Sequence, residues 1–288
     1  MTIWNLGSIN IDLVYDVPHL PGAGETLAAG SMTRGLGGKG ANMSVAAARA
    51  AGRVAHIGAV GADGRWAAEL MLEYGVDTRF IARVDAPTGH AVIAVEPSGE
   101  NLIMILGGAN RAVPEDLIGR ALSEASAGDI FLTQNETNGQ ARAVRMARDL
   151  GLKVTYAAAP FDALAVQEVL PMLDLLVLNE VEASQLEAAT GLDPKTLPVA
   201  DVIVTLGARG CRWYGADGVR DYPALPVAPV DTTGAGDTFT GYVVAGLDQG
   251  LPMPQAIAQA LRAAAIMVTR HGTADVIPDL KDVQDARF

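Results

Sequence analysis

Cysteine, aromatic residues and positive charge are all scarce in this chain of 288 residues. The one cysteine, Cys211, excludes a disulfide within the chain and fits a reducing compartment. Lys and Arg number 21 against 33 Asp and Glu, and the formal net charge of -12 argues against a nucleic-acid surface. A basic, apolar leader is lacking at the start, and the apolar runs are too short to span a bilayer. We therefore expect a cytoplasmic protein without nucleic-acid or membrane partners.

Segments typical of strands and helices alternate through most of the chain. Half of the residues are hydrophobic, which at this length suffices for a large core. Such alternation predicts an α/β fold with a mostly parallel sheet and helices on both faces. The expected strands are 2–8, 54–60, 129–134, 152–157, 174–178 and 201–206, with a hairpin at 211–222, and the expected helices follow Gly38 and cover 66–74, 115–125, 138–150, 162–170, 180–189, 237–249 and 253–269.

Two segments depart from this alternation. Residues 13–35 contain short alternating pieces broken by Pro and Gly, and residues 88–106 form an alternating pair around the turn 97–100. Both patterns predict short antiparallel strands. We expect segments 11–35 and 87–108 to form a small antiparallel subdomain inserted in the α/β core of a single domain, residues 1–288.

Polar residues lie where a strand ends and where a helix begins. Asn10 and Asp12 follow the first strand, where open α/β sheets place ligand groups, although both residue types also favour turns. Lys39 and Asn42 lie in Gly-Leu-Gly-Gly-Lys-Gly-Ala-Asn, at the start of an alanine-rich helix that we expect to end with Gly52 as its left-handed residue. The spacing does not match a Walker P-loop.

The stretch Asp231-Thr-Thr-Gly-Ala-Gly-Asp237 opens another helix. Small residues expose backbone N–H groups at a helix N-terminus, which favours binding of an anion. Asp237 would repel that anion, unless it takes a proton from a nucleophile that attacks it, as in phosphoryl transfer to a hydroxyl. The alternative is that Asp237 only caps the helix.

Three motifs occur together in a defined order: Gly-Gly-Lys-Gly-Ala-Asn42, Asn179-Glu-Val-Glu182 and the stretch ending at Asp237. In this combination the chain resembles the ribokinase-like (PfkB) sugar kinase family over essentially its whole length. The resemblance implies a three-layer ribokinase-like core with a small antiparallel β lid. It also implies an ATP-dependent carbohydrate kinase that transfers the γ-phosphoryl group to a primary hydroxyl of a small sugar.

The same resemblance implies roles for individual residues on the nucleotide side. Asp237 would be the catalytic base, and the N–H groups of Gly234, Ala235 and Gly236 would form the anion hole. Asn179 and Glu182 match the pattern that helps to hold Mg²⁺ beside ATP, largely through water, although a first-turn Glu also favours the helix dipole. The residues implied to lie against ATP are Asn179, Thr205, Gly207, Gly210 and Gly236.

On the sugar side the residues are most similar to those of the ribokinase branch, which implies D-ribose as substrate. Carboxylates and amides suit a neutral polyol, because they form several directional hydrogen bonds. The lid would exclude water and provide the interface of a homodimer. The implied sugar ligands are Asn10, Asp12, Gly38, Lys39, Asn42, Glu136 and Asp237.

A monovalent cation beside the anion hole is also implied. Asp231 and the carbonyls of Thr233, Met267 and Gly272 match the loop that binds K⁺, with Val276 where a hydroxyl residue is common. Two departures stand out. Gly234 replaces an alanine frequent in ribokinases, and the connection over residues 191–200 is short where relatives have an additional helix.

Other functions remain open at this point. Fructokinase, 2-keto-3-deoxygluconate kinase and nucleoside kinase share the implied fold, and fold alone does not choose among them. With only 5% aromatic residues, the chain shows no cluster for stacking a nucleobase. A non-catalytic sugar- or nucleotide-binding regulator is expected to lack the base, whereas Asp237 is present. A dinucleotide-dependent dehydrogenase lacks support, because no fingerprint with the required glycine spacing occurs.

Overall fold

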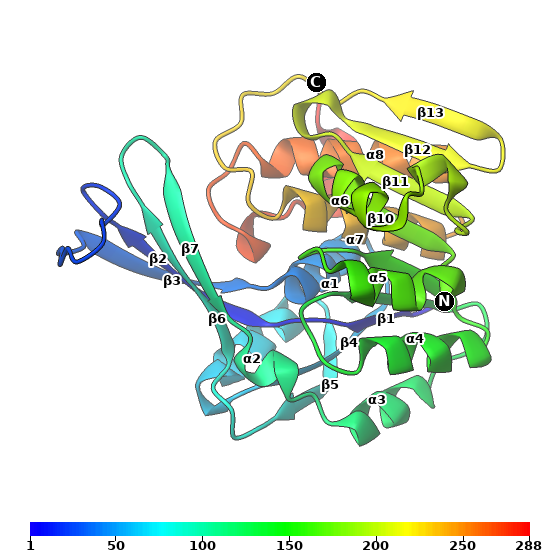
Figure 1. Ribbon diagram of the computed structural model, residues 1–288, viewed down its shortest axis with the longest axis horizontal. Coiled ribbons are helices and arrows are strands. Elements are labelled where there is room, and N and C mark those ends of the chain that lie inside the picture. The colour runs from blue at the N-terminus through cyan, green and yellow to red at the C-terminus, as the bar shows by residue number, and fades with distance from the viewer.

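A nine-stranded sheet forms the centre of the protein in the computed structural model, which describes residues 1–288 (Figure 1). Its order is β13-β12-β11-β10-β9-β8-β1-β4-β5, and all pairs from β11 to β5 are parallel. The strands are β1 (Ile3–Leu6), β4 (Val54–Val60), β5 (Asp77–Arg83), β8 (Ile130–Gln134), β9 (Lys153–Ala157), β10 (Leu175–Asn179), β11 (Asp201–Thr205), β12 (Cys211–Gly215) and β13 (Gly218–Tyr222).

Helices cover both faces of this sheet and bury two separate apolar clusters. The three-layer α/β architecture expected from the sequence is therefore confirmed. No helix has the length and apolarity that crossing a bilayer requires. One face carries α1 (Lys39–Arg49), α2 (Arg65–Glu73), α7 (Ala235–Asp248), α8 (Met253–Met267) and α9 (Leu280–Asp285), and the other carries α3 (Glu115–Leu122), α4 (Gln140–Asp149), α5 (Ala163–Val169) and α6 (Glu180–Thr190).

A second sheet projects from one side of the core in Figure 1. Its order is β3-β2-β6-β7, with β2 (Asn10–Asp16), β3 (Ser31–Gly37), β6 (Gly89–Val95) and β7 (Asn101–Leu106). The pairs β2–β3 and β6–β7 are antiparallel hairpins, as the alternating patterns predict. The hairpins join through parallel pairing of β2 with β6, which local sequence patterns do not specify. Asn10 and Asp12 lie on β2 in this sheet, so they are strand residues instead of turn residues.

Close approach of two glycines places α1 against the connection from β1 to β2. A Cβ on Gly40 would lie 2.4 Å from the backbone of Gly7, and one on Gly38 would lie 2.8 Å from the nitrogen of Asn10. Glycine is required here, because any side chain would separate the helix from the strands. The helix start that carries Lys39 and Asn42 thereby reaches the base of the small sheet.

Several elements differ from expectation. Strand β5 and helix α9 were not predicted, and the left-handed residue after α1 is Ala51 (φ 63) instead of Gly52. Gly52 is small for a different reason, because a Cβ there would lie 2.9 Å from the carbonyl oxygen of Ala47. The sequence pattern of α1 locates the helix. It does not show whether a glycine after the helix is needed for a left-handed backbone or for lack of space.

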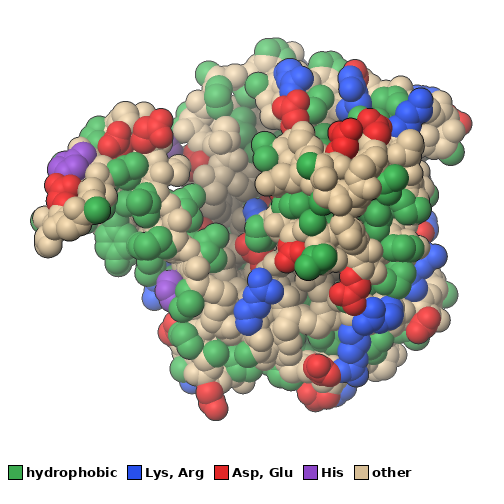
Figure 2. Space-filling view, in the orientation of Figure 1, with side chains coloured by type: hydrophobic (Ala, Val, Ile, Leu, Met, Phe, Trp, Pro, Cys, Tyr) green, Lys and Arg blue, Asp and Glu red, His purple; other side chains and the backbone are tan.

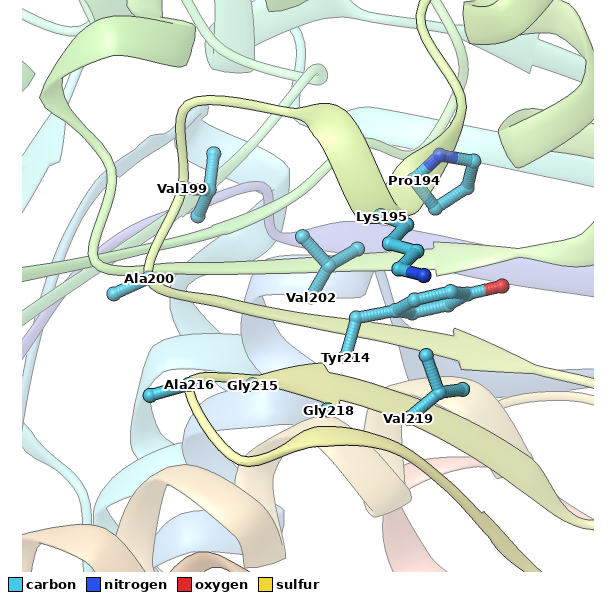
Figure 3. A pocket seen from close by; sticks show the side chains of 10 residues that line it. All are labelled: Pro194, Lys195, Val199, Ala200, Val202, Tyr214, Gly215, Ala216, Gly218 and Val219. Carbon is cyan, nitrogen blue, oxygen red and sulfur yellow. The ribbon is translucent and has the colours of Figure 1, made fainter.

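The short connection over residues 191–200 contains one turn of 3-10 helix, Pro194–Thr196. It leaves a groove of about 240 Å³ against β11, β12 and β13, lined among others by Lys195, Tyr214 and Val219 (Figure 3). This groove lies beside the connection that the sequence shows to be short.

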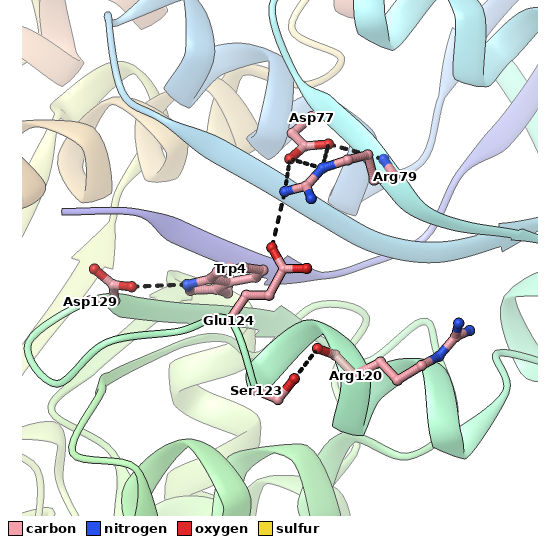
Figure 4. A network of polar contacts seen from close by, with 7 residues as sticks. All are labelled: Trp4, Asp77, Arg79, Arg120, Ser123, Glu124 and Asp129. Atoms are coloured by element: carbon pink, nitrogen blue, oxygen red, sulfur yellow. Dashed lines mark hydrogen bonds and ion pairs between the residues drawn. The ribbon is translucent and has the colours of Figure 1, made fainter.

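The amino ends of the central strands are held by polar contacts that Figure 4 shows. Trp4 donates its indole N–H to Asp129 over 3.0 Å. Arg79 pairs with Asp77 at 2.8 Å and with Glu124 at 3.2 Å. These contacts join β1, β5 and the end of α3, far from the helix starts that carry the predicted site.

Candidate active site

Asp237 lies in the first turn of α7, and the residue is only 8% exposed. The N-cap residue is Gly234 in the left-handed conformation (φ 76), and no side chain caps this helix. The amide nitrogen of Asn42 instead donates to the Asp237 carboxylate over 2.9 Å. The carboxylate is therefore directed toward α1 and does not serve as a cap.

The N–H groups at the start of α7 are largely free. Those of Gly234, Gly236 and Asp237 have no acceptor in the protein, whereas the N–H of Ala235 lies 3.3 Å from the carbonyl oxygen of Thr232. Free N–H donors and the partial positive charge of a helix N-terminus make an anion site. Two members of the expected trio, Gly234 and Gly236, therefore have free N–H groups, and the third, Ala235, makes one long contact within the turn.

Acidic side chains converge beside this anion site. Burial raises the pKa of Asp12 to about 7, with further contributions from the negative charges of Glu136 and Asp237. Burial also raises the pKa of Asp237, against the opposing effects of Lys39 and Asn42. An oxygen of Glu136 accepts hydrogen bonds from the Ser8 hydroxyl and, at 3.1 Å, from the Lys39 backbone N–H. These neighbouring carboxylates can accept hydrogen bonds from hydroxyl groups, and their negative charge disfavours binding of a second anion among them.

Lys39 is the cation that these acids share. Its pKa is raised first by Asp237 and further by Glu136 and Glu182, against the effect of burial. Glu136 belongs to the predicted sugar side and Glu182 to the predicted nucleotide side. Lys39 therefore lies between the two sides and offsets part of their negative charge.

The sugar side contains polar atoms that the protein leaves without partners. The side-chain oxygen of Asn42 is buried and has no hydrogen-bond partner. Asn10 accepts a hydrogen bond from the amide of Asn110 at 2.7 Å, and this leaves its own amide nitrogen free. Asn110 in turn accepts from the N–H of Ile9 at 2.9 Å. Sequence reasoning missed Asn110 and Ser8, although the run Gly107-Gly-Ala-Asn110 carries the same small-residue signal as the other helix starts.

The position of the Asp12 carboxylate requires a glycine at residue 37. A Cβ on Gly37 would lie 2.1 Å from the nearer oxygen of the Asp12 carboxylate. The Asp12 side chain therefore lies across β3, the neighbouring strand, and glycine is the residue type that permits this.

On the nucleotide side, Asn179 and Glu182 form a reciprocal capping box at the start of α6. The Asn179 side chain accepts from the Glu182 N–H, and the Glu182 carboxylate accepts from the Asn179 N–H, both at 2.8 Å. One Glu182 oxygen remains without a protein partner. No group of three or more His, Cys, Asp or Glu residues is suitably placed to hold a metal directly. The residues present fit an ion held through water and do not fit a cage of protein ligands.

The predicted ATP-facing turn follows β11. Gly207 (φ 58) and Gly210 (φ 96) both have positive φ, and the Leu206 N–H donates to the Gly210 carbonyl at 2.7 Å. Arg209 in this turn pairs with Glu180 of α6 at 2.5 Å. Thr205, at the end of β11, is adjacent in the sheet to Asn179, so these residues occupy one edge.

The predicted cation loop is brought together around Asp231. Its carboxylate accepts from the Thr233 N–H at 2.9 Å and from the Gly272 N–H at 3.4 Å. The carbonyl of Met267 accepts a hydrogen bond from the Arg270 N–H at 3.0 Å. The carbonyl of the next residue, Val268, accepts from the Asp231 N–H at 3.1 Å. The loop is therefore compact and lies immediately before the start of α7.

Figure 2 shows an open recess between the small sheet and the body of the protein. Together with this fold, a helix start with free N–H groups and a buried carboxylate beside unpartnered polar atoms have the chemistry that a sugar kinase of the three-layer α/β class requires. The chain belongs to the pfkB family of carbohydrate kinases, whose profile matches residues 2–280. It is a carbohydrate kinase, as the three motifs predict.

Individual relatives are similar over nearly the full length. A ribokinase from Haemophilus influenzae is 35% identical over 96% of this chain and 95% of its own. The structure of a Thermotoga maritima ribokinase has a TM-score of 0.88 at 32% identity, covering 99% of this chain and 98% of that one. An Arabidopsis thaliana ribokinase complexed with ribose and ATP has a TM-score of 0.84 at 29% identity, covering 98% and 97%.

The raised pKa of Asp12 predicts a pH-dependent stability. In the folded state the Asp12 carboxyl keeps its proton up to about pH 7, whereas in the unfolded chain it loses the proton near pH 3.8. Asp12 therefore lowers the free energy of unfolding increasingly as the pH rises from about 4 to 7. Asp12→Asn should therefore raise the free energy of unfolding by about 2 kcal/mol more at pH 8 than at pH 5. Urea unfolding at both pH values measures this. Asp16→Asn, at the exposed end of the same strand, is the control. An equal gain at both pH values would contradict the shift.

Proposed function

We propose that this protein phosphorylates the primary hydroxyl of D-ribose with ATP and produces ribose 5-phosphate. The observation that carries the proposal is the buried Asp237 carboxylate beside free N–H groups at the start of α7. The similarity to ribokinases, one of them complexed with ribose and ATP, supports this choice of substrates. Fructose, 2-keto-3-deoxygluconate and nucleosides are the alternative acceptors within the same family.

In the proposed reaction Asp237 takes the proton from the sugar hydroxyl as that oxygen attacks the γ-phosphorus. The bond from the γ-phosphorus to the β,γ-bridging oxygen of ATP breaks, and ADP leaves with that electron pair. Burial raises the pKa of Asp237, which strengthens it as a base. The N–H groups of Gly234 and Gly236, with Ala235 in the same turn, stabilise the charge on the transferred phosphoryl group. A proton acceptor and an anion site at one helix start bring both reactants to the same place.

The sugar is held by carboxylates and amides, each of which keeps at least one polar atom without a partner in the protein. Asp12 and Glu136 accept hydrogen bonds from hydroxyls, the free amide of Asn10 donates, and the unpaired oxygen of Asn42 accepts. Gly38 permits the backbone to approach, and Lys39 offsets the negative charge. The segments 11–35 and 87–108 act as a lid within a single domain, and exclude water from competing as acceptor.

Mg²⁺ would be held through water by Asn179 and Glu182, where it would offset charge on the ATP phosphates. The turn with Thr205, Gly207 and Gly210 would lie against the nucleotide. Burial raises the pKa of Glu182, and the Asn179 N–H and Lys39 oppose this effect. The Mg²⁺ ion would favour the charged carboxylate further.

The small sheet also provides a proposed homodimer interface. Strand β7 is an edge strand, and its Ile103, Met104 and Ile105 are 50%, 59% and 61% exposed. Met32 on β3 is 51% exposed. Hydrophobic side chains gather on this part of the surface in Figure 2. An exposed apolar edge strand is a surface for pairing with another sheet, and a second copy of the chain is the proposed partner.

Replacing the proposed base tests the reaction directly. Asp237→Asn should lower kcat with D-ribose about a hundredfold or more, because general-base catalysis contributes roughly 10²–10⁴. ATP affinity, measured by calorimetry, should stay within about threefold, since Asp237 is not assigned to the nucleotide. Asp248→Asn, a buried carboxylate in the same helix, is the control and should keep turnover. Turnover of Asp237→Asn close to wild type would refute the base assignment.

The loop around Asp231 predicts activation by K⁺. It connects directly to the start of α7, so an ion bound there by Asp231, Thr233, Met267 and Gly272 would hold the anion site in place. Initial rates in K⁺ should exceed those in a Tris buffer of equal ionic strength. Equal rates would remove K⁺ from the proposal and leave the rest intact.

The dimer proposal predicts a monomer when β7 becomes charged. Ile103→Glu with Ile105→Glu should convert a dimer to a monomer in analytical ultracentrifugation, because charge at an apolar interface is not compensated. Val219→Glu, an exposed hydrophobic residue on β13, is the matched control and should remain dimeric. A wild-type protein that stays monomeric at tens of micromolar would contradict the interface.

A further inference from the structure

Four polar side chains lie buried together beneath the sugar side of the site. They come from three neighbouring strands and one helix, and each is at most 1% exposed. A buried polar group costs about 1–3 kcal/mol unless it is hydrogen-bonded, so a cluster of this kind requires a reason. None has a role in the reaction described above. The four are Asn5 on β1, Ser44 on α1, His56 on β4 and Gln134 on β8.

The direction of every hydrogen bond around His56 is determined by its partners. Nε2 of His56 lies 3.1 Å from the Gly7 carbonyl, which only accepts, so Nε2 carries the proton. Nδ1 then accepts from the Ser44 hydroxyl at 2.8 Å. That hydroxyl oxygen accepts from the Asn5 amide at 2.8 Å. Burial lowers the pKa of His56 to about 4, which keeps the imidazole neutral, as this arrangement requires.

The chain of hydrogen bonds ends on two backbone carbonyls. The Asn5 amide also donates to the Gly40 carbonyl at 2.8 Å, and the Asn5 oxygen accepts from Gln134 at 3.0 Å. His56 binds the carbonyl of Gly7. Gly7 and Gly40 are the two glycines in close contact where α1 meets the connection from β1 to β2. The network therefore holds both sides of that contact.

The residues adjacent to these glycines bind Glu136. The hydroxyl of Ser8, next to Gly7, donates to the Glu136 carboxylate, as does the backbone N–H of Lys39, next to Gly40, at 3.1 Å. The Gly40 N–H lies 3.2 Å from the Ser8 oxygen and completes the link. Each donor to Glu136 is thus one residue from a carbonyl that the buried network holds in place.

We propose that Asn5, Ser44 and His56 are positioning residues, which fix the carboxylate of Glu136 for binding of the sugar through Gly7 and Gly40. The proposal rests on the proposed function, in which Glu136 binds sugar hydroxyls. None of the three is among the proposed sugar ligands. A network that only stabilises the core would change the free energy of unfolding and leave the Michaelis constant for the sugar unchanged.

Two substitutions of His56 separate its two hydrogen bonds. The amide of His56→Asn reaches the Nδ1 position and keeps the Ser44 contact, whereas that of His56→Gln reaches the Nε2 position and donates to Gly7. We expect His56→Asn to raise KM for D-ribose about threefold to tenfold, the equivalent of one misplaced hydrogen bond. KM for ATP and kcat should change by less than about twofold. His56→Gln should raise KM for D-ribose by less than His56→Asn does, because it keeps the bond to Gly7 and loses only the contact with Ser44.

Controls distinguish this role from a general loss of stability. Tyr242→Phe removes another buried side-chain bond to a backbone carbonyl, that of Pro278, and should leave KM for D-ribose unchanged. Ser44→Ala removes the hydroxyl between Asn5 and His56, and should raise KM for D-ribose even if His56→Asn fails to fold. Unfolding in urea, measured for each variant, separates stability from binding.

The outcomes are distinguishable. If Glu136→Gln leaves KM for D-ribose unchanged, Glu136 is not a sugar ligand, and the proposed sugar site and this inference fail together. If Glu136→Gln raises that KM but His56→Asn and Ser44→Ala do not, only the positioning role is overturned. A KM for D-ribose that is as high in His56→Gln as in His56→Asn, or higher, would also overturn it, because keeping the Gly7 bond would then give no benefit.

Discussion

A buried carboxylate at the start of a helix is the feature on which this site depends. Asp237 is almost inaccessible, and burial favours its neutral form. Three features favour its charged form: the amide of Asn42, the ammonium of Lys39 and the free N–H groups at the start of α7. Since two of these come from α1, the relative placement of α1 and α7 determines whether Asp237 can act as a base.

The fold maintains this placement through glycines and buried polar contacts. Helices α1 and α7 pack on the same face of the large sheet and share one apolar cluster. A Cβ on Gly241 of α7 would lie 2.6 Å from the carbonyl oxygen of Met43, so these helices approach as closely as glycine allows. The first turn of α1 also approaches Gly7 closely. Small residues at these contacts therefore position the proposed catalytic groups as directly as the polar side chains do.

Motifs of consecutive residues could be predicted well from the sequence, whereas long-range partners could not. The three-layer fold and the family are confirmed, because strand–helix alternation and the motifs ending at Asn42, Glu182 and Asp237 are local signals. The link between Asn10 and Asn110 spans 100 residues, and that between Ser8 and Glu136 spans 128. No local pattern marks such pairs. The contact between the N–H of Ala235 and the carbonyl of Thr232 depends on the geometry of the turn, which no sequence pattern specifies.

Phosphorylation of a defined acceptor tests the central claim most directly. ADP release would be measured with Mg·ATP and K⁺ against D-ribose, D-fructose, 2-keto-3-deoxygluconate, adenosine and fructose 6-phosphate, each at several concentrations. The account predicts the highest kcat/KM for D-ribose, and loss of that activity in Asp237→Asn. Preference for another acceptor would contradict the ribose assignment while leaving the kinase intact. No turnover with any acceptor, with ATP binding retained, would contradict the catalytic reading of Asp237.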